Sequence, residues 1–380
     1  MNIAIDITSI IYKRGVSRYT SNLVRALIEE NHDLVLYGSS LRQKNQLITF
    51  AETLKQFYNR SIQTEFQSFP PSLLTLLWHT LKKNTFSSKV TSASIFHSWD
   101  WLQPPVTTLP LVSTIHDLAI LKFPESAHKD ILRQHQKAWS LLQERQTRLI
   151  AVSRATKKDI IDLLGYPSYL VDVVHEALPM EVKEVNAAIS EETAEQIKTH
   201  LRLEKPYLLF VGTREPRKNL DRLIQAWQPL SPEIDLIIAG SAGWDESEKS
   251  IMPGLRFLGR VSDEELSVLY GEAELFAYPS LYEGFGLPIL EAFHHGTPVV
   301  TSNNSGMMEV AGNAAELVDP LNIEGIRKGL ETVLNEKPDA QQKRLQRMII
   351  RQQMFSWKRV AKETLAVYEK VCKEYQENTK

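Results

Sequence analysis

The chain has 380 residues, of which 43% are apolar, and a formal net charge of −2. This length predicts roughly two to three domains with ordinary hydrophobic cores. The single cysteine, Cys372, excludes an internal disulfide framework and a zinc cluster built on cysteines. No apolar run is long enough to span a bilayer, and residues 1–7 are typical of a first strand, not of a signal peptide.

Short apolar segments alternate with helical patterns along most of the chain. This alternation predicts parallel sheets whose faces are covered by helices. The expected strands form two series: residues 3–7, 34–38, 95–97, 111–115, 149–152 and 170–174, and then residues 207–211, 236–239, 256–258, 275–278, 299–301 and 315–318. We therefore expect an α/β protein with two Rossmann-like domains.

A polar stretch, residues 181–206, separates the two series and ends in Lys205-Pro206. Polar segments with few apolar residues commonly connect domains. We place the first domain at residues 1–184 and the second at residues 185–355. A last helical pattern, from Trp357 to about Tyr375, follows the second sheet within residues 356–380.

Two glutamates flank a glycine loop in the second domain, in the stretch Glu283-Gly284-Phe285-Gly286-Leu287-Pro288-Ile289-Leu290-Glu291. The pattern predicts a strand, a loop and then a helix that starts near Pro288. The orphan amides at such a helix start attract anions, and carboxylates accept hydrogen bonds from the hydroxyl groups of a sugar or ribose. The alternative is a buried turn followed by a solvated Glu291.

A basic loop follows the first strand of the second domain, with the sequence Gly212-Thr213-Arg214-Glu215-Pro216-Arg217-Lys218-Asn219. The carboxyl end of a strand in an open α/β sheet points its loop towards the ligand. Arg and Lys at that position suit a diphosphate, because both stabilise negative charge. The alternative is a basic loop that is merely solvated.

Together these motifs resemble the retaining glycosyltransferases of family 4, which have the GT-B fold. The spacing of Glu283 and Glu291 is similar to the E-x7-E motif of that family. The resemblance also covers the basic loop, Phe257-Leu258-Gly259-Arg260-Val261 and Gly296-Thr297-Pro298-Val299-Val300. Four blocks in the expected order are a far stronger signal than one motif.

The resemblance implies two Rossmann-like domains with parallel sheets that face each other across a crevice, and a terminal helix that packs back towards the first domain. It assigns the acceptor to the first domain and the nucleotide sugar to the second. Of the catalytic residues, it implies that Glu283 holds the donor sugar and that Lys218 holds the diphosphate. Thr213 stands where many relatives have an arginine, so Arg217 or Arg214 replaces it, and we prefer Arg217.

The remaining donor contacts are also implied by the resemblance. Glu291 is expected to bind the ribose, and the amides near Gly286 and Leu287 the diphosphate. Arg260 and Val261 are expected to contact the base. The full set of expected donor-binding positions is Gly15, Gly212, Thr213, Arg260, Val261, Gly284, Phe285, Gly286, Leu287 and Glu291.

In the first domain, two segments resemble ligand-binding loops of the family. Lys13-Arg14-Gly15 resembles the glycine loop beside the acceptor and the diphosphate, although a plain turn fits this single glycine equally well. His116, at the end of an apolar strand, resembles the histidine that contacts the donor sugar, and we expect Asp117 to orient its ring. Ser153 is expected to be a helix N-cap.

Residues 71–83 contain several leucines, Trp78 and the basic pair Lys82-Lys83. An apolar helix of this kind is usually buried or half-buried in the protein. The alternative is peripheral contact with a membrane surface that carries a lipid-linked acceptor.

We therefore expect a metal-independent, retaining hexosyltransferase of cell-surface polysaccharide synthesis, with no cofactor. No Asp-x-Asp triplet is present in the sequence to hold a metal. The expected partners are a nucleotide diphosphate sugar, with GDP-mannose preferred by family analogy, and a glycan or lipid-linked glycan acceptor, but no nucleic acid. The expected location is the cytoplasm or the inner face of the membrane. The alternatives are a nucleotide-sugar epimerase on the same fold and a catalytically silent nucleotide-sugar binding subunit.

Overall fold

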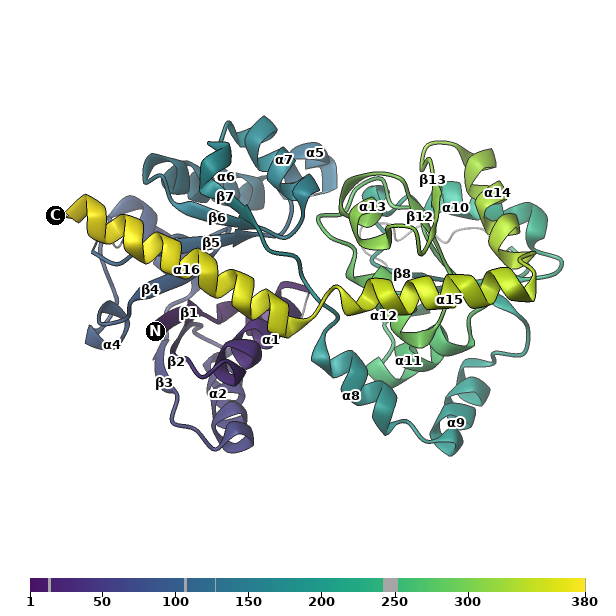
Figure 1. Ribbon diagram of the computed structural model, residues 1–380, viewed down its shortest axis with the longest axis horizontal. Coiled ribbons are helices and arrows are strands. Elements are labelled where there is room, and N and C mark those ends of the chain that lie inside the picture. The colour runs from purple at the N-terminus through teal and green to yellow at the C-terminus, as the bar shows by residue number, and fades with distance from the viewer. Residues whose placement is uncertain (13–14, 106–107, 127, 242–251, 380) are drawn as a thin grey trace. The chain divides into compact units, whose positions relative to one another are not determined.

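The structure is a computed structural model that describes residues 1–12, 15–105, 108–126, 128–241 and 252–379. The chain divides into two compact units (Figure 1). Unit 1 comprises Met1–Glu176 and Trp357–Lys380, and unit 2 comprises Ala177–Ser356. The chain thus enters unit 2 after Glu176, whereas the sequence places the domain boundary after residue 184.

Unit 1 is built on a seven-stranded parallel sheet with the strand order β3-β2-β1-β4-β5-β6-β7. Adjacent side chains along β1, such as Ile3, Ala4 and Ile5, are all buried, because helices cover both faces of the sheet. The strands are β1 (Asn2–Asp6), β2 (Asp33–Ser39), β3 (Gln63–Gln67), β4 (Ile95–Trp99), β5 (Leu111–Ile115), β6 (Arg148–Ala151) and β7 (Val171–Val173).

The helices of unit 1 include several short elements between the longer ones. They are η1 (Thr8–Tyr12), α1 (Gly15–Glu29), α2 (Lys44–Tyr58), α3 (Pro71–Thr75), the π-helical η2 (Leu76–Thr80), α4 (Ser88–Thr91), α5 (Ala119–Lys122), η3 (Pro124–Ser126), α6 (Lys129–Glu144), α7 (Arg154–Leu164), η4 (Ser168–Leu170) and α16 (Trp357–Thr379).

After unit 2 the chain returns to unit 1, where it forms helix α16, which is drawn in yellow in Figure 1. This helix packs against α1, β5 and β6. Arg148 of β6 is buried and forms ion pairs with Glu374 of α16 at 2.6 Å and with Asp172 of β7 at 2.9 Å. A segment more than 200 residues away in sequence therefore completes the packing of unit 1.

Unit 2 contains a six-stranded parallel sheet with the order β10-β9-β8-β11-β12-β13. The strands are β8 (Tyr207–Val211), β9 (Asp235–Ala239), β10 (Leu255–Gly259), β11 (Leu275–Tyr278), β12 (Val299–Ser302) and β13 (Glu316–Val318). The helices are α8 (Met180–Ala188), α9 (Glu191–Leu201), η5 (Pro216–Lys218), α10 (Leu220–Trp227), η6 (Gln228–Leu230), α11 (Asp263–Glu272), α12 (Leu287–His295), α13 (Ser305–Ala311), α14 (Ile323–Leu334) and α15 (Pro338–Gln353).

The predicted α/β class and parallel sheets are confirmed, and each predicted strand lies within two residues of an observed one at both ends. One strand was not predicted. β3 has the polar sequence QTEFQ, lies at the edge of its sheet and is only partly buried, so its sequence lacks the apolar signal on which the prediction depended.

Both sheets reverse their strand order at one point, between β1 and β4 in unit 1 and between β8 and β11 in unit 2. In open α/β sheets, ligands bind beyond the carboxyl ends of the strands at such a switch point. The loops that follow these strands are therefore the places to look for function.

A buried histidine anchors α16 to the sheet of unit 1. The ring of His97 in β4 forms hydrogen bonds with Tyr368 of α16, at 2.6 Å, and with Thr114 of β5, at 2.8 Å. Burial, with a smaller contribution from the charge of His116, lowers the pKa of His97 to about 3, so the ring is neutral. It can therefore donate one hydrogen bond and accept the other.

We predict that Tyr368→Phe lowers the free energy of unfolding by about 1–2 kcal/mol, because a nitrogen of the buried His97 ring loses its partner. Urea unfolding at pH 7 measures this change. The control is Tyr169→Phe, since Tyr169 is exposed. Equal stability of both variants and the parent chain would contradict the anchoring role of Tyr368.

Candidate functional site

The basic loop of unit 2 follows β8 directly and is fixed by hydrogen bonds to neighbouring loops. Asn219, which has a left-handed backbone (φ 60°), donates from its side chain to the carbonyl groups of Pro279 and Pro320, at 2.9 and 2.7 Å. The amide of Leu281 donates to the carbonyl of Arg217 at 2.8 Å. The loop after β8 is therefore held against the loop after β11, at the switch point of the sheet.

These two loops bring three charged side chains together. The two oxygens of the Glu283 carboxylate accept hydrogen bonds from Lys218 Nζ and from an Arg217 guanidinium nitrogen, each at 2.7 Å. The Lys218 ammonium also donates to the hydroxyl of Tyr278 at 2.7 Å, and Arg217 pairs with Glu215 at 2.6 Å. The three expected catalytic residues of this unit thus form one cluster.

The charge state of Glu283 follows from its partners. Burial alone would raise its pKa, but the charges of Lys218 and Arg217 and their hydrogen bonds outweigh burial and lower the pKa to about 2. The carboxylate is therefore ionised at neutral pH, although its side chain is only 10% exposed.

The structure separates the roles of the two candidate arginines. Arg217 lies in the cluster, whereas the guanidinium of Arg214 lies over the ring of Phe257, 4.9 Å from its centroid. Thr213 is exposed, and its hydroxyl accepts a hydrogen bond from Ser241 at 3.3 Å. Gly212 directly follows β8, and its amide donates a hydrogen bond to the carbonyl of Ala239.

The glycine loop after Glu283 lies at the start of α12. Gly286 precedes the helix with φ of 116°, a conformation that side-chain-bearing residues rarely adopt. Across from it, a Cβ on Gly306 would lie 2.3 Å from the carbonyl oxygen of Gly284, so α13 can pack this closely only with glycine there. Phe285 is buried, with its ring against Phe355, and Leu287 begins the helix, whose first amides could bind an anion.

Glu291 is buried within unit 2. Its carboxylate accepts a hydrogen bond from the hydroxyl of Tyr270 at 3.1 Å, and its exposed fraction is 6%. The alternative of a solvated Glu291 is therefore wrong. Binding of a ribose by Glu291 stays a prediction. Arg260 and Val261 follow β10, where Arg260 is exposed and Val261 is half-buried, and their contact with a base likewise stays a prediction.

We predict that Glu283→Gln lowers the free energy of unfolding by about 3 kcal/mol at pH 7, because the half-buried Lys218 loses its carboxylate partner and Arg217 loses one of its two. A carboxylate with a lowered folded-state pKa stabilises the protein above its ordinary pKa of 4.5, and this stabilisation is lost as the pH falls towards 2. The difference between variant and parent should therefore shrink at pH 3. Urea unfolding at both pH values measures it, and a difference independent of pH would contradict the assignment.

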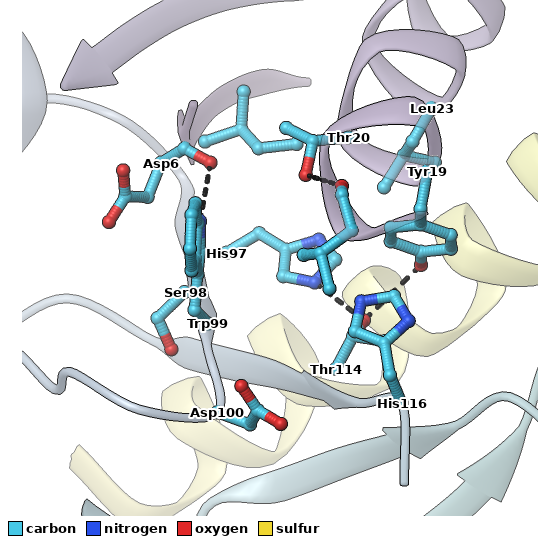
Figure 2. Close-up of a pocket in the computed structure, with 12 residues that line it drawn as sticks. Asp6, Tyr19, Thr20, Leu23, His97, Ser98, Trp99, Asp100, Thr114 and His116 are labelled. Atoms are coloured by element: carbon cyan, nitrogen blue, oxygen red, sulfur yellow. Dashed lines mark hydrogen bonds between the residues drawn. The ribbon is translucent and has the colours of Figure 1, made fainter. Parts of the chain in front are cut away.

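In unit 1, a pocket lies at the carboxyl ends of β1, β4 and β5, beside the first turns of α1 (Figure 2). Its lining includes Tyr19, Trp99, Asp100, Thr114 and His116. The predicted residue His116 is thus placed at the switch point of this sheet.

Gly15 is the first residue of α1 and is exposed, with no atom within 4 Å of the position a Cβ would take. The space around it does not require a glycine. The other two residues of the expected glycine loop, Lys13 and Arg14, lie outside the described residues.

The prediction that Asp117 orients His116 is wrong. The Asp117 carboxylate accepts a hydrogen bond from the amide of Ala119, two residues later, at 2.9 Å. The imidazole Nδ1 is bonded instead to Glu176, at 2.8 Å. Glu176 is not among the residues predicted from the sequence, although its position just after the last strand of the first series was an available signal. Ser153 is confirmed as the N-cap of α7, since its hydroxyl accepts a hydrogen bond from the amide of Thr156.

Residues 71–83 form α3 and the π-helical η2, followed by Lys82 and Lys83. Leu74 and Trp78 are buried in the core of unit 1, as the half-buried interpretation predicts, whereas Leu76 and Leu81 are exposed. Among the described residues, no helix is both long enough and apolar enough to cross a membrane.

Comparison with known proteins identifies the class. Residues 13–181 match the family described as Glycosyltransferase Family 4, and residues 191–352 match Glycosyl transferases group 1. The O-antigen chain mannosyltransferase B of Escherichia coli is 33% identical over 268 residues, which cover 68% of this chain and 69% of the relative. A glycogen synthase of Mycobacterium tuberculosis is 30% identical over 295 residues, covering 72% and 68%.

Solved structures agree on the fold. Anabaena Alr3699/HepE in complex with UDP and glucose superimposes with a TM-score of 0.70 at 18% identity, covering 97% of this chain and 100% of that one. WaaG, a glycosyltransferase involved in lipopolysaccharide biosynthesis, superimposes with a TM-score of 0.63 at 14% identity, covering 97% and 99%. The fold is that of GT-B glycosyltransferases. This chain belongs to glycosyltransferase family 4, and its relatives include mannosyltransferases of surface polysaccharide synthesis.

Proposed function

We propose that this glycosyltransferase moves a hexose, preferably mannose, from a nucleotide diphosphate sugar to a hydroxyl of a growing glycan, with retention of configuration and without a metal or other cofactor. The observation that carries the proposal is the cluster of Arg217, Lys218 and Glu283 at the switch point of unit 2. The preference for GDP-mannose rests on the mannosyltransferases among the relatives.

The cluster suits a leaving diphosphate. Arg217 offers a planar fork of donors and Lys218 a compact charge, and both stabilise negative charge that develops as the glycosidic bond to phosphate breaks. Amides at the start of α12 add further donors. These fixed cations would supply the charge stabilisation that a metal ion supplies in other transferases.

The two cations of the cluster face two carboxylates, Glu283 and Glu215, so the cluster is electrically balanced without a ligand. An arriving diphosphate would compete with Glu283 for Lys218 and Arg217. Glu283 would then be released to accept hydrogen bonds from hydroxyl groups of the donor sugar. In this scheme Glu283 occupies the anion site until the donor replaces it.

The remaining roles follow the family resemblance. Glu291 would bind the ribose, and His116 would contact the donor sugar. For retention, we propose that the acceptor hydroxyl attacks the face from which the diphosphate leaves. The acceptor loses its proton to the departing phosphate oxygen, the new glycosidic bond forms as the bond to phosphate breaks, and nucleoside diphosphate is the second product.

We predict that Lys218→Ala weakens binding of the donor about tenfold to a hundredfold, because a hydrogen bond between charged partners is lost. Thermal stabilisation by a panel of nucleotide sugars, with and without magnesium, measures binding, since only the folded protein takes the ligand. Glu291→Ala should also reduce the shift. Lys205→Ala is the matched control, because Lys205 is exposed in the same unit.

A selective shift that is independent of magnesium and is lost in Lys218→Ala would support the donor site. Release of nucleotide should then accelerate when the glycan acceptor is added, whereas an epimerase needs no acceptor and a silent binding subunit releases nothing. Proton NMR of the product gives the anomeric configuration. Absence of a shift with every nucleotide sugar, in folded protein, would contradict the proposal.

We also propose that the face of unit 1 around α3 and η2 contacts an anionic membrane surface. Leu76 and Leu81 are exposed there, and Lys82 and Lys83 follow directly. Apolar side chains beside basic residues favour the interface of an anionic bilayer.

Sedimentation with vesicles tests the membrane proposal. The parent chain should sediment with vesicles that contain phosphatidylglycerol and not with phosphatidylcholine alone, and the double variant Leu81→Gln, Lys82→Glu should lose this binding. Leu163→Gln, which changes an exposed leucine of α7, is the control. Equal sedimentation of the double variant and the parent would exclude this face as the contact.

A further inference from the structure

The pair formed by His116 and Glu176 contains a buried carboxylate to which the proposed function assigns no role. Glu176 Oε1 lies 2.8 Å from His116 Nδ1, and the side chains are only 7% and 18% exposed. A buried carboxylate in this geometry accepts a hydrogen bond from Nδ1–H and fixes the orientation of the ring. Because Nδ1 is bonded in this way, Nε2 is the nitrogen through which His116 would meet a ligand in the pocket that it lines.

A second contact braces the ring of His116 from α1. The ring of Tyr19 meets it edge-on, with centroids 4.6 Å apart and planes at 84°. The Tyr19 hydroxyl bonds to Thr114, and Thr114 bonds in turn to His97, as Figure 2 shows. Glu176 therefore binds Nδ1 of the imidazole, and the Tyr19 ring restricts its rotation.

The charges around His116 favour its protonated form. Burial would lower its pKa, but the hydrogen bond and charge of Glu176, with the nearby charges of Asp100 and Asp117, raise the pKa above its ordinary value of 6.5. Other titratable residues that line the same pocket are Asp6 and Tyr19, whose pKa values are raised by burial, and His97, which is neutral. Glu176 is the only one of these carboxylates with a direct bond to the ring that the structure records among the described residues.

The packing around His116 includes both residues at which the chain crosses the boundary of unit 1. Glu176 is the last residue of unit 1 before the chain passes into unit 2, and Trp357 is the first residue after it returns. The ring of Trp357 lies 5.9 Å from that of Tyr19. The chain therefore leaves unit 1 at Glu176, which contacts His116, and re-enters it at Trp357, which contacts the Tyr19 ring.

We propose that Glu176 is the positioning residue for His116: it binds Nδ1–H and directs Nε2 into the pocket, where Nε2–H of the doubly protonated ring donates a hydrogen bond to a hydroxyl or phosphate oxygen of the donor substrate. The proposal rests on the proposed glycosyl transfer only for the identity of that ligand. The position of Glu176 at the end of unit 1 also makes the orientation of His116 depend on how the connecting segment leaves β7.

The test compares Glu176→Gln with the parent chain by two independent readouts. The first is the titration of the His116 ring by NMR on protein with labelled histidine, assigned with His116→Gln. Glu176→Gln should lower the pKa of His116, because the amide keeps a hydrogen-bond acceptor but removes the charge. Asp117→Asn is the matched control, since its carboxylate is close but bonds to a backbone amide, and it should give a clearly smaller shift.

The second readout is transfer kinetics. In Glu176→Gln, kcat at pH 7.5 should fall roughly tenfold, by analogy with residues that orient a metal-binding histidine, while KM for the donor changes less than threefold. The fall of activity at high pH should begin at a lower pH, because the protonated ring is lost sooner. Glu176→Asp, which keeps the charge at a shorter reach, should retain the pKa better than the activity, and it replaces Glu176→Gln if that variant does not fold.

The readouts separate this proposal from the proposed function. An unchanged titration of His116 in both Glu176 variants would overturn the positioning role, whatever the enzyme transfers. Full activity of His116→Gln would also overturn it, because the positioned group would then have no task. Absence of donor binding in the parent chain, with a normal shift of the His116 titration in Glu176→Gln, would refute the glycosyltransferase assignment of the ligand and leave the Glu176–His116 pair intact.

Discussion

The buried carboxylate of Glu283 organises unit 2, because it joins the loop after β8 to the loop after β11. Its two oxygens accept hydrogen bonds from the two cations of the first loop, and these contacts keep the carboxylate ionised although it is buried. Buried charges persist only when they are paired and hydrogen-bonded. The contact between the basic loop and the loop after β11 therefore depends on this charge pairing as well as on the hydrogen bonds of Asn219 and Leu281.

The two units share a strand order but differ in the chemistry at their switch points. Unit 2 presents Arg217 and Lys218 there, which suits an anion. Unit 1 presents His116 and Asp100 together with the aromatic groups of Tyr19 and Trp99, a mixture that suits hydroxyl groups and sugar rings. Since the fold alone does not decide function, it is these residues at the switch points that distinguish the two halves of the enzyme.

The sequence predicted much of the fold and of the cluster in unit 2, because buried parallel strands are continuous apolar runs and because the loops with Lys218 and Glu283 have a recognisable order. It did not predict β3, whose polar edge residues carry no such signal. The prediction that Asp117 is the partner of His116 was based only on the fact that the two residues are adjacent in the sequence. The observed partner, Glu176, is 60 residues away, and only the pairing of β5, β6 and β7 brings the two together.

The return of α16 to unit 1 has a consequence for how the protein is made. Tyr368, Val360 and Ala361 of this helix are buried in unit 1, but the ribosome delivers them only after all 180 residues of unit 2, from Ala177 to Ser356. At a synthesis rate of about 5–20 residues per second, the first 176 residues wait roughly 10 to 40 s for their last helix. Unit 2 is complete before unit 1, so the N-terminal part of this chain is the last to reach its final packing.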